Sequence, residues 1–381
     1  MDIRLSEEQE MLKNAARDFL TEKCPKTLVR ELEKDDQGYS PQMWQEIADL
    51  GWLGLIFPEK YGGGDMSFLD LAVLLEEMGR ACFPGPFLPT VTLGGLPILD
   101  FGTEDQQQKY LPEIASGKAI FTTAILEPGD SKYKAASIKV KAAADNDGYV
   151  LNGTKLFVPD AHVADYILCV ARTKDSAKAE DGITIFIVDA GSPGITTTLL
   201  KTIGGDKQCE VAFDNVKVPE GNILGKLNEG WSIVQNIIER AALAKCCEMV
   251  GGMQAVLEMT VEYANQRVQF DRPIASFQLI QEHCVNIVID ADSSRMITYE
   301  AAWRLSNGLP YSMEAAMAKA WAGDAYVRVT TLASQVHGGV GIMEDHDMTL
   351  YFRRAKAGEL FLGDARFHRE AVARGLQFET V

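Results

Sequence analysis

Apolar residues recur at helical spacing through the first 115 or so residues of the chain. The segments "SEEQEMLKNAARDFLTEK" and "SPQMWQEIADLGWLGL" each begin at a serine that can cap a helix, Ser6 and Ser40. Two more helical patterns, "SFLDLAVLLEEMGRAC" and "TEDQQQKYLPEIASGK", follow along the chain, and Thr103 can cap the second. The pattern therefore predicts an N-terminal helical domain over residues 1–117.

The period of the pattern changes near residue 118. Short β-rich runs such as "AIFTTAIL", "DYILCVART" and "CEVAFDNVKVP" are bounded by turn signals such as "DNDG" and "GSPG". Because these runs follow one another without helical segments between them, the sequence predicts an antiparallel, sandwich or barrel-like middle domain over residues 118–226.

Helical spacing returns at Trp231 and continues towards the end of the chain. One very long helix is expected from Trp231 to about residue 270, and a second is expected to begin at the serine cap Ser276. Two further helical patterns complete a four-helix bundle over residues 227–381. The predicted fold class is therefore α+β, with an N-terminal α-helical domain, a middle antiparallel β domain and a C-terminal four-helix bundle.

Composition and charge narrow the functions that are open to the chain. The apolar runs end well before the ~18 residues that a membrane span needs, so no span is expected. A net charge of −17 argues against a nucleic-acid partner. The seven cysteines and five histidines are scattered without zinc-ligand spacing, which favours reduced thiols and no metal site. We expect a cytoplasmic protein, although an organelle protein whose presequence had been removed would look the same.

Five motifs in this order resemble those of the acyl-CoA dehydrogenase family. They are "ILEPGDS", "LNGTKLFVPDAHVADYILCVAR", "FDNVKVPEGNILG", "QRVQFDRPIASFQLIQ" and "QVHGGVGIMEDHDMTLYFRRA", which together run from residue 125 to residue 355. The resemblance implies a flavoprotein that binds FAD, dehydrogenates an acyl-CoA thioester and passes electrons to an electron-transferring flavoprotein. It also implies a dimer of dimers, as a homotetramer or a heterotetramer, because the flavin-binding segment reaches into a neighbouring subunit.

The residues that the resemblance assigns to the dinucleotide half of FAD have suitable chemistry. They are Arg267, Phe270, Gln278, Gln335, Gly338 and Gly339. Arg267 carries a planar fork that matches phosphate oxygens, and the two glycines permit close backbone approach. Taken alone, Arg267 is better explained as a solvated helix arginine, and the glycines would equally form a turn that ends a helix.

The flavin ring and the CoA chain are placed by the same resemblance. Ile125 with Leu126, and Phe157 with Val158, would border the isoalloxazine ring. CoA would enter beside the loop 129–133, where Ser131 and Lys132 would meet polar or phosphate groups of the substrate. The alternative for Ser131 and Lys132 is an exposed turn.

The sequence departs from the family where a catalytic base is expected. A glutamate usually takes the α-proton of the thioester from one of two positions, and these hold Leu362 and Ala241 here. Other departures are Ala242, Leu126, Pro159 and Asp271. The chain is therefore either a dehydrogenase with a relocated base, acting on a bulky, cyclic or dicarboxylic acyl group, or a catalytically degenerate partner subunit of a hetero-oligomer.

Two charges in an apolar helical segment bear on this choice. From Ala241, positions i+4 and i+7 are Lys245 and Glu248, which share a helix face with it and point towards the acyl end of the substrate site. Burying charges is costly unless they pair or meet a ligand. One interpretation is a half-buried ion pair. The other is that Lys245 binds a polar group of the acyl chain and Glu248 acts as the relocated base, for which Glu239 and Asp364 are further candidates.

Overall fold

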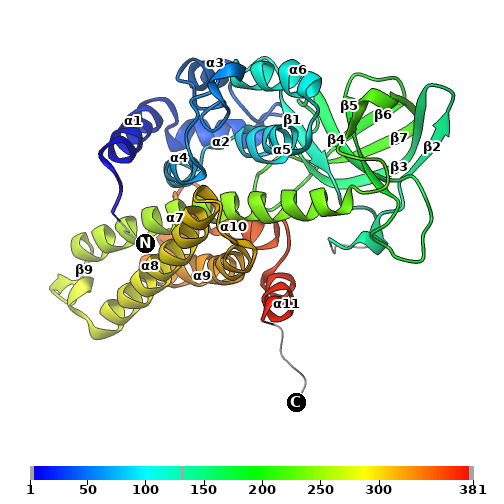
Figure 1. The fold of residues 1–381 in the computed structure, drawn as a ribbon. Coiled ribbons are helices and arrows are strands. Elements are labelled where there is room, and N and C mark those ends of the chain that lie inside the picture. Colours follow the sequence, from blue (N-terminus) through cyan, green and yellow to red (C-terminus); the bar gives the residue numbers. More distant parts are fainter. Residues whose placement is uncertain (1–3, 130–132, 377–381) are drawn as a thin grey trace.

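A computed structural model of the chain describes residues 4–129 and 133–376 in three successive regions (Figure 1). The first region is helical. Its elements are α1 (Glu7–Lys23), α2 (Lys26–Lys34), α3 (Pro41–Asp49), η1 (Glu59–Tyr61), α4 (Phe68–Ala81), η2 (Pro89–Gly95), α5 (Leu96–Phe101) and α6 (Glu104–Ala115). The predicted caps are present, since Ser6 and Thr103 form capping boxes and Ser40 accepts a hydrogen bond from the backbone N–H of Met43.

The second region is a β domain, seen on the right of Figure 1. Its strands are β1 (Phe121–Ala124), β2 (Lys141–Asp145), β3 (Gly148–Pro159), β4 (Tyr166–Arg172), β5 (Ile183–Asp189), β6 (Ile195–Leu200), β7 (Gln208–Pro219) and β8 (Ile223–Leu224). They form one sheet in the order β6-β7-β3-β2-β4-β5-β8, with β1 beside β4. Most pairs are antiparallel, as predicted, but β1 pairs with β4 in parallel along its whole length.

The third region is a helical bundle. It contains α7 (Trp231–Gln266), the hairpin β9 (Val268–Gln269) and β10 (Arg272–Pro273), η5 (Ile274–Ser276), α8 (Gln278–Ser306), α9 (Ser312–His337), η6 (Gly338–Ile342), α10 (Met348–Leu360) and α11 (Ala365–Gly375). The prediction that Ser276 caps the second long helix is wrong. Ser276 lies in η5 and donates to the carbonyl of Pro273, and α8 starts after Phe277 without a side-chain cap.

The long helix α7 joins the three regions. It has 36 residues, which is about 54 Å at ~1.5 Å per residue, and it crosses the molecule from the β domain to the far end of the bundle (Figure 1). It packs very closely against α4. A Cβ added at Gly79 would lie 1.9 Å from the carbonyl oxygen of Glu248, and one at Gly251 would lie 1.7 Å from that of Glu76. The two backbones therefore meet at a distance that only glycine permits.

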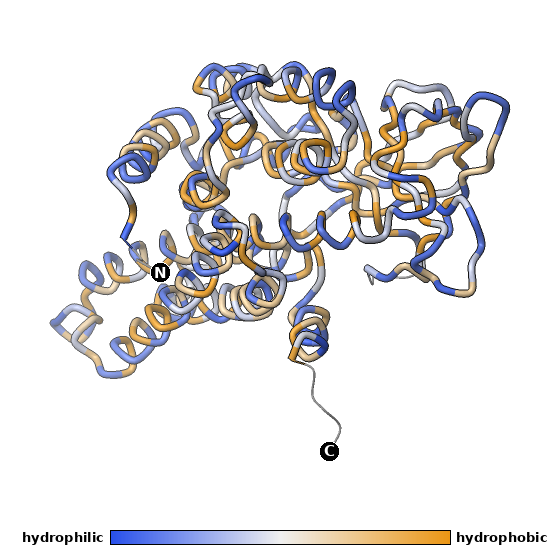
Figure 2. Tube along the Cα trace, viewed as in Figure 1, coloured by the Kyte–Doolittle hydropathy of each residue, from blue (hydrophilic) through white to orange (hydrophobic). Residues whose placement is uncertain are grey.

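Apolar cores hold the regions together. One cluster of buried residues combines the N-terminal helices with α7, α9 and α10, and a second combines η2, α6, the strands β4 and β5 and the first turns of α7. Figure 2 shows hydrophobic positions mainly where the elements face one another. Among the described residues, no helix is both long and apolar enough to cross a membrane.

A buried ion pair ties β3 to the turn that follows β1. The Lys155 ammonium is fully enclosed and donates to a carboxylate oxygen of Glu127 at 2.7 Å and to the carbonyl of Ile125 at 3.0 Å. Glu127 also accepts from the backbone N–H groups of Lys139 and Val140. Because every partner of this network is satisfied, it fixes β3, which carries Phe157 and Val158, and the segment after β1, which carries Ile125 and Leu126.

Replacing Lys155 by methionine should lower the free energy of unfolding by about 3–5 kcal/mol, because Glu127 would stay buried without its counter-charge. Urea unfolding followed by circular dichroism measures the change. The matched control is Lys217→Met, which breaks an ion pair with Asp145 whose side chains are 81% and 41% exposed. It should change stability by less than about 1 kcal/mol. Equal effects of the two substitutions would contradict the burial of the Lys155–Glu127 ion pair.

Candidate functional site

The residues predicted to hold the dinucleotide come together at the far end of the bundle. Arg267 directly follows α7, Gln278 begins α8, and Gln335 lies in the last turn of α9. A small apolar cluster of Ala264, Ile274 and Val336 packs these three segments against one another. The three polar side chains themselves are exposed on the single chain.

The glycine pair at the end of α9 leaves open space. Gly338 has φ 62°, a left-handed conformation that favours glycine. A Cβ added at Gly338 or Gly339 would meet no atom of the chain within 4 Å. Side chains at these two positions would therefore fit within the chain. The backbone of both glycines is exposed and accessible to a ligand.

Backbone strain marks three of the predicted site residues. Among the described residues, the large apolar side chains with left-handed φ are Phe157 (52°), Phe270 (52°) and Leu362 (57°). Such a conformation costs roughly 1–2 kcal/mol and is often held at functional sites. Phe270 is 86% exposed and Phe157 is 51% exposed, so neither ring gains full burial within the chain. Phe157 lies in β3 and Phe270 directly follows β9, and these two strands are at opposite sides of the molecule (Figure 1), so within one chain the two uncovered rings belong to separate surfaces.

The segments expected beside the flavin ring expose one aromatic side chain, that of Phe157. A bulge in the β3–β7 ladder between Lys155 and Val158 turns Phe157 out of the sheet. The side chains of Ile125 and Val158 are buried, and Leu126 is partly buried. These three residues would therefore contact the flavin ring mainly through their backbone groups. Of their side chains, only that of Leu126 is partly accessible.

The two positions where a catalytic glutamate is expected lie in one apolar cluster. Ala241 is fully buried and Leu362 is 3% exposed, and both pack in the cluster that also contains Ile125. Both positions thus lie in the same packed apolar region, and neither of them supplies a carboxylate to it.

Polar groups nevertheless hold the backbone of the turn around Leu362 from three sides. The hydroxyl of Tyr133 accepts from the Leu362 N–H at 3.2 Å, and the His368 imidazole lies 2.9 Å from the Leu362 carbonyl oxygen. The buried ammonium of Lys319 donates to the carbonyls of Glu359 and Gly363 at 2.9 and 2.8 Å. Burial lowers the pKa of His368 to about 4 and that of Lys319 to about 8. The backbone of the turn is therefore held in place, although position 362 carries a leucine where the family usually has a glutamate.

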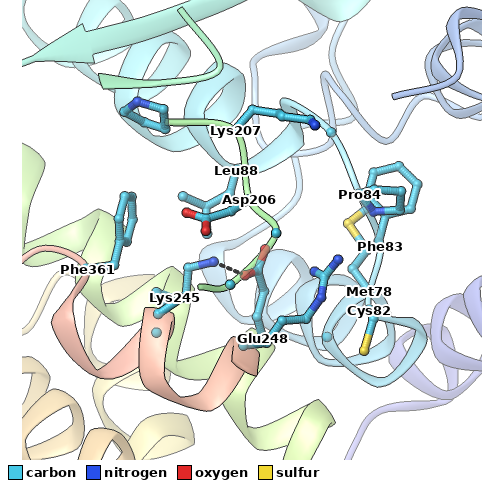
Figure 3. Close-up of a pocket in the computed structure, with 18 of the residues that line it drawn as sticks. Met78, Cys82, Phe83, Pro84, Leu88, Asp206, Lys207, Lys245, Glu248 and Phe361 are labelled. Carbon is cyan, nitrogen blue, oxygen red and sulfur yellow. Dashed lines mark hydrogen bonds and ion pairs between the residues drawn. The ribbon is translucent and has the colours of Figure 1, made fainter. Parts of the chain in front are cut away.

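A cavity of about 130 Å³ lies where the three regions meet. Figure 3 shows Lys245, Glu248 and Asp206 pointing towards a common space, with Phe361 on one side and Cys82 and Pro84 on the other. The polar residues that line it are Glu33, Asp160, Asp206, Lys207, Gln208, Lys245, Glu248, Tyr326 and Arg354. A mixture of both charges is unusual for a cavity that neighbours an apolar cluster, because each enclosed charge needs a partner.

The ion pair expected between Lys245 and Glu248 is present. Both side chains are about a quarter exposed, and the Lys245 ammonium also lies 5.3 Å from the centre of the Phe361 ring. Lys245 and Glu248 therefore both form an ion pair with one another and line the cavity. The roles predicted for them towards a substrate stay predictions.

Asp160 is a further carboxyl in this cavity. Burial, followed by the nearby Asp206 carboxylate, raises its pKa from 3.8 to about 7, while Lys245 and Lys207 oppose the shift. Its backbone has φ 51°, directly beyond the end of β3. The carboxyl is therefore partly protonated at neutral pH.

A second, larger cavity of about 540 Å³ opens beside the start of α7 and is lined by Tyr133, Trp231, Glu239 and Arg374 among others. Burial raises the pKa of Glu239, which accepts from the Ser312 hydroxyl at 2.8 Å. Ser131 and Lys132, predicted at the CoA entrance, lie outside the described residues.

Asp364, the remaining candidate base, caps α11 by accepting from the Phe367 N–H at 2.8 Å. Its carboxylate is therefore used at the end of a helix.

Comparison with known proteins decides the family. The profiles of the acyl-CoA dehydrogenase N-terminal, middle and C-terminal domains match residues 6–118, 122–216 and 228–377. The chain belongs to the acyl-CoA dehydrogenase family. This confirms the resemblance, the α+β fold class and the expected class of FAD-dependent oxidoreductase that acts on CH–CH bonds.

Several other members of the family match the chain over nearly its whole length. The probable acyl-CoA dehydrogenase YngJ of Bacillus subtilis (strain 168) is 32% identical, covering 99% of this chain and 100% of the relative. Butyryl-CoA dehydrogenase from Megasphaera elsdenii superposes with a TM-score of 0.91 at 31% identity, covering 99% and 100% of the two chains. A chain of the ChsE4-ChsE5 complex from Mycobacterium tuberculosis superposes with a TM-score of 0.90 at 30% identity, covering 100% of both.

Sequence reasoning missed several polar residues of the site. Tyr133 and Arg354 gave no signal, since one follows a polar turn and the other belongs to an Arg-Arg pair in a mixed helix. Lys319 did give one. It is a lone charge in the alanine-rich stretch "AAMAKAWAG", a pattern like that around Lys245, and it is fully buried.

Replacing Asp160 by asparagine should stabilise the protein most at high pH. Because the folded pKa is raised, the stabilisation from the protonated carboxyl is complete below about pH 4 and is lost as the pH rises through about 7. The amide of the variant stays neutral throughout, so thermal midpoints of the two proteins should differ most above pH 7 and converge towards pH 4. Asp175→Asn, at an exposed position, should shift the midpoint little at any pH. If the thermal midpoints of the wild-type protein and Asp160→Asn differed by the same amount at every pH, the enclosed position of the Asp160 carboxyl would be contradicted.

Proposed function

We propose that the chain is an FAD-dependent acyl-CoA dehydrogenase that oxidises a thioester with an unusual acyl group. The observation that carries the proposal is the cavity at the meeting point of the three regions, which two charged residues of α7 and the Phe361 ring border. The apolar cluster with Ala241 and Leu362 contains three residues, Ala135, Ile238 and Ala242, that also line the larger cavity. A thioester entering by the larger cavity would pass this cluster, and its acyl end would reach the charged cavity.

The dinucleotide half of FAD would be held between subunits. Arg267, with Gln278 and Gln335, would bind phosphate and ribose groups of a neighbouring subunit's cofactor, and Phe270 would cover the adenine. Exposed apolar side chains along α8, including Leu279, Val285, Ile289 and Met296, suit burial against another subunit. Hydrophobic positions recur along the length of this helix (Figure 2). Homotetramer and heterotetramer both satisfy this arrangement.

The chain's own groups would bind the thioester and move its proton. When bound, FAD accepts the hydride that leaves Cβ while a base takes the proton from Cα. With alanine and leucine at the usual base positions, the proton acceptor would be a carboxylate elsewhere. Glu248 in the charged cavity and Glu239 in the larger cavity are the candidates. Electrons would then pass to an electron-transferring flavoprotein, by analogy with the family.

The acyl group would be bulky, cyclic or dicarboxylic. Lys245 and Glu248 make the inner end of the site polar, so a simple aliphatic chain would leave charges facing apolar carbon. Ser131 and Lys132 would contact the CoA chain at the entrance. The protein would work in the cytoplasm, in line with the unpaired thiols of its seven cysteines.

A second function is favoured by one observation. The turn around Leu362 is held in place by Tyr133, His368 and Lys319, yet Leu362 itself carries no carboxylate. This is what a partner subunit would show if it had kept the scaffold and lost the base. Such a subunit would complete the FAD site of a competent neighbour in a hetero-oligomer.

Anaerobic spectroscopy separates the two functions. The purified chain, if it is the enzyme, should be yellow and should bleach when a dicarboxylic or cyclic acyl-CoA is added. A colourless protein that turns yellow only with another chain would support the partner subunit. In either case Leu362→Glu should raise the bleaching rate at least about 100-fold where FAD is bound, because it places a base on the fixed turn. Leu362→Gln, of the same size but without a base, should not.

Replacing Arg267 by alanine should weaken the affinity for FAD at least about tenfold, because two charge-assisted hydrogen bonds would be lost. Less FAD should then stay with the protein during gel filtration. The ratio of flavin to protein absorbance measures this. Arg304→Ala, at the other end of α8 where the arginine pairs with Glu300 and Glu314, should keep the cofactor. Full retention by the Arg267 variant would remove this residue from the proposed site.

A further inference from the structure

Asp160 is the carboxyl of the charged cavity that has no partner within the described residues. It directly follows β3, and its backbone N–H donates to the Lys207 carbonyl at 2.8 Å, which fixes its position. Its side chain lines the cavity. In the described part of the chain the carboxyl forms no hydrogen bond and no ion pair, so its neighbours act on it through burial and charge alone.

The other carboxylates of the cavity are engaged. Glu248 pairs with Lys245, and Glu33 accepts a hydrogen bond from an arginine of α10 at 2.6 Å. Asp206 is exposed to solvent and accepts from a neighbouring hydroxyl at 2.8 Å. Asp160 is therefore the acceptor that a ligand in the cavity would find free.

The charges on the cavity wall leave a small negative excess. Four acids line the cavity against three cations, so the wall carries one negative charge more when all of them are ionised. The acids are Glu33, Asp160, Asp206 and Glu248, and the cations are Lys207, Lys245 and Arg354. A cation bound at Asp160 would balance this excess, whereas a further carboxylate would enlarge it.

The carboxyl of Asp160 would gain from a cation. Burial and the Asp206 carboxylate raise its pKa to about 7, and the charges of Lys245 and Lys207 oppose that shift only in part. A positive charge within hydrogen-bonding distance would favour the ionised form of the carboxyl. What this carboxyl lacks is therefore a cation that donates a hydrogen bond to it.

The rest of the wall suits an aliphatic chain. Leu88, Met249 and Phe361 line the same cavity, and Figure 3 shows Leu88 and Phe361 beside Lys245 and Asp206. The cavity volume of about 130 Å³ leaves room for only a few non-hydrogen atoms. The end of an acyl group would fit there, and CoA itself would not.

We propose that Asp160 binds an amino group at the far end of the acyl chain, so that the preferred substrates are CoA thioesters of amino acids whose amine lies away from the thioester. An ammonium carries three donors and makes strong hydrogen bonds to a carboxylate. The Lys245–Glu248 pair, which is neutral as a unit, forms the wall beside it. This inference rests on the proposed function and narrows its substrate class, because it favours an acyl group that carries an amine and disfavours a dicarboxylic one.

Calorimetry on the FAD-loaded protein, with the flavin chemically reduced so that it accepts no hydride, measures binding without turnover. The acyl groups of 6-aminohexanoyl-CoA and heptanoyl-CoA have equal length and end in an ammonium or a methyl group. The wild-type protein should bind the amino thioester at least about tenfold more tightly. Asp160→Asn should lose most of this preference. Its affinity for heptanoyl-CoA should change less than about threefold, because the amide has the same size as the carboxyl.

Asp206→Asn is the matched control, because this acid lines the same cavity but is exposed to solvent and already hydrogen-bonded. It should keep the preference for the amino thioester. Pimeloyl-CoA, which ends in a carboxylate at the same chain length, should bind more weakly than heptanoyl-CoA.

Three results would each overturn the proposal. They are equal affinity of the wild-type protein for the amino and methyl thioesters, a preference that Asp160→Asn retains, and tighter binding of pimeloyl-CoA than of heptanoyl-CoA. If the FAD-loaded protein bound none of the three thioesters, the proposed acyl-CoA function itself would fail.

Discussion

The backbone contact between α4 and α7 is the constraint on which the site depends. Gly79 and Gly251 let the two helices approach until Cα hydrogen atoms face carbonyl oxygens, and any side chain at either position would collide with backbone. The contact at Gly79 is with Glu248 itself, so the packing of the helices also sets the position of that carboxylate. Lys245, one turn earlier on α7, is thereby held at the wall where the N-terminal helices, the β domain and α10 meet.

The charges of this cavity form a linked set. Lys245 and Glu248 neutralise one another, Glu33 is shared by two arginines, and Asp160 is shifted towards its protonated form by burial and by Asp206. Enclosed charges would strongly favour unfolding if they were unpaired, so the arrangement tolerates them only as partnered groups. Arg354 follows the same rule, since its guanidinium lies 3.5 Å from a carboxylate oxygen of Glu33.

The turn at Leu362 shows how a scaffold and its chemistry can separate. A buried ammonium, an imidazole and a phenol hold four backbone groups of Glu359, Leu362 and Gly363, and the left-handed φ of Leu362 is maintained by these contacts. Strain of this kind persists only where the surroundings over-determine it. The chain has kept the strained turn while placing an apolar side chain on it, which is why a relocated base and a partner-subunit role are both open chemical solutions.

The sequence by itself determined the order of helical and β regions, most helix starts, and the family, because these follow from local periodicity, capping and short motifs. Ser6, Ser40 and Thr103 act over three residues and could be identified from their neighbours. It also suggested the pairing of Lys245 with Glu248, which is local to one helix face. Ser276 failed as a cap because a tight hairpin and η5 displaced the start of α8. Only the tertiary structure brought Arg354 into a cavity with Gln208 and Glu33, which lie on elements far apart in the chain. It likewise decided that β1 runs parallel to β4 and that Tyr133 meets Leu362. Burial, charge balance and unpartnered donors arise from the packing of distant segments, and no local pattern encodes them.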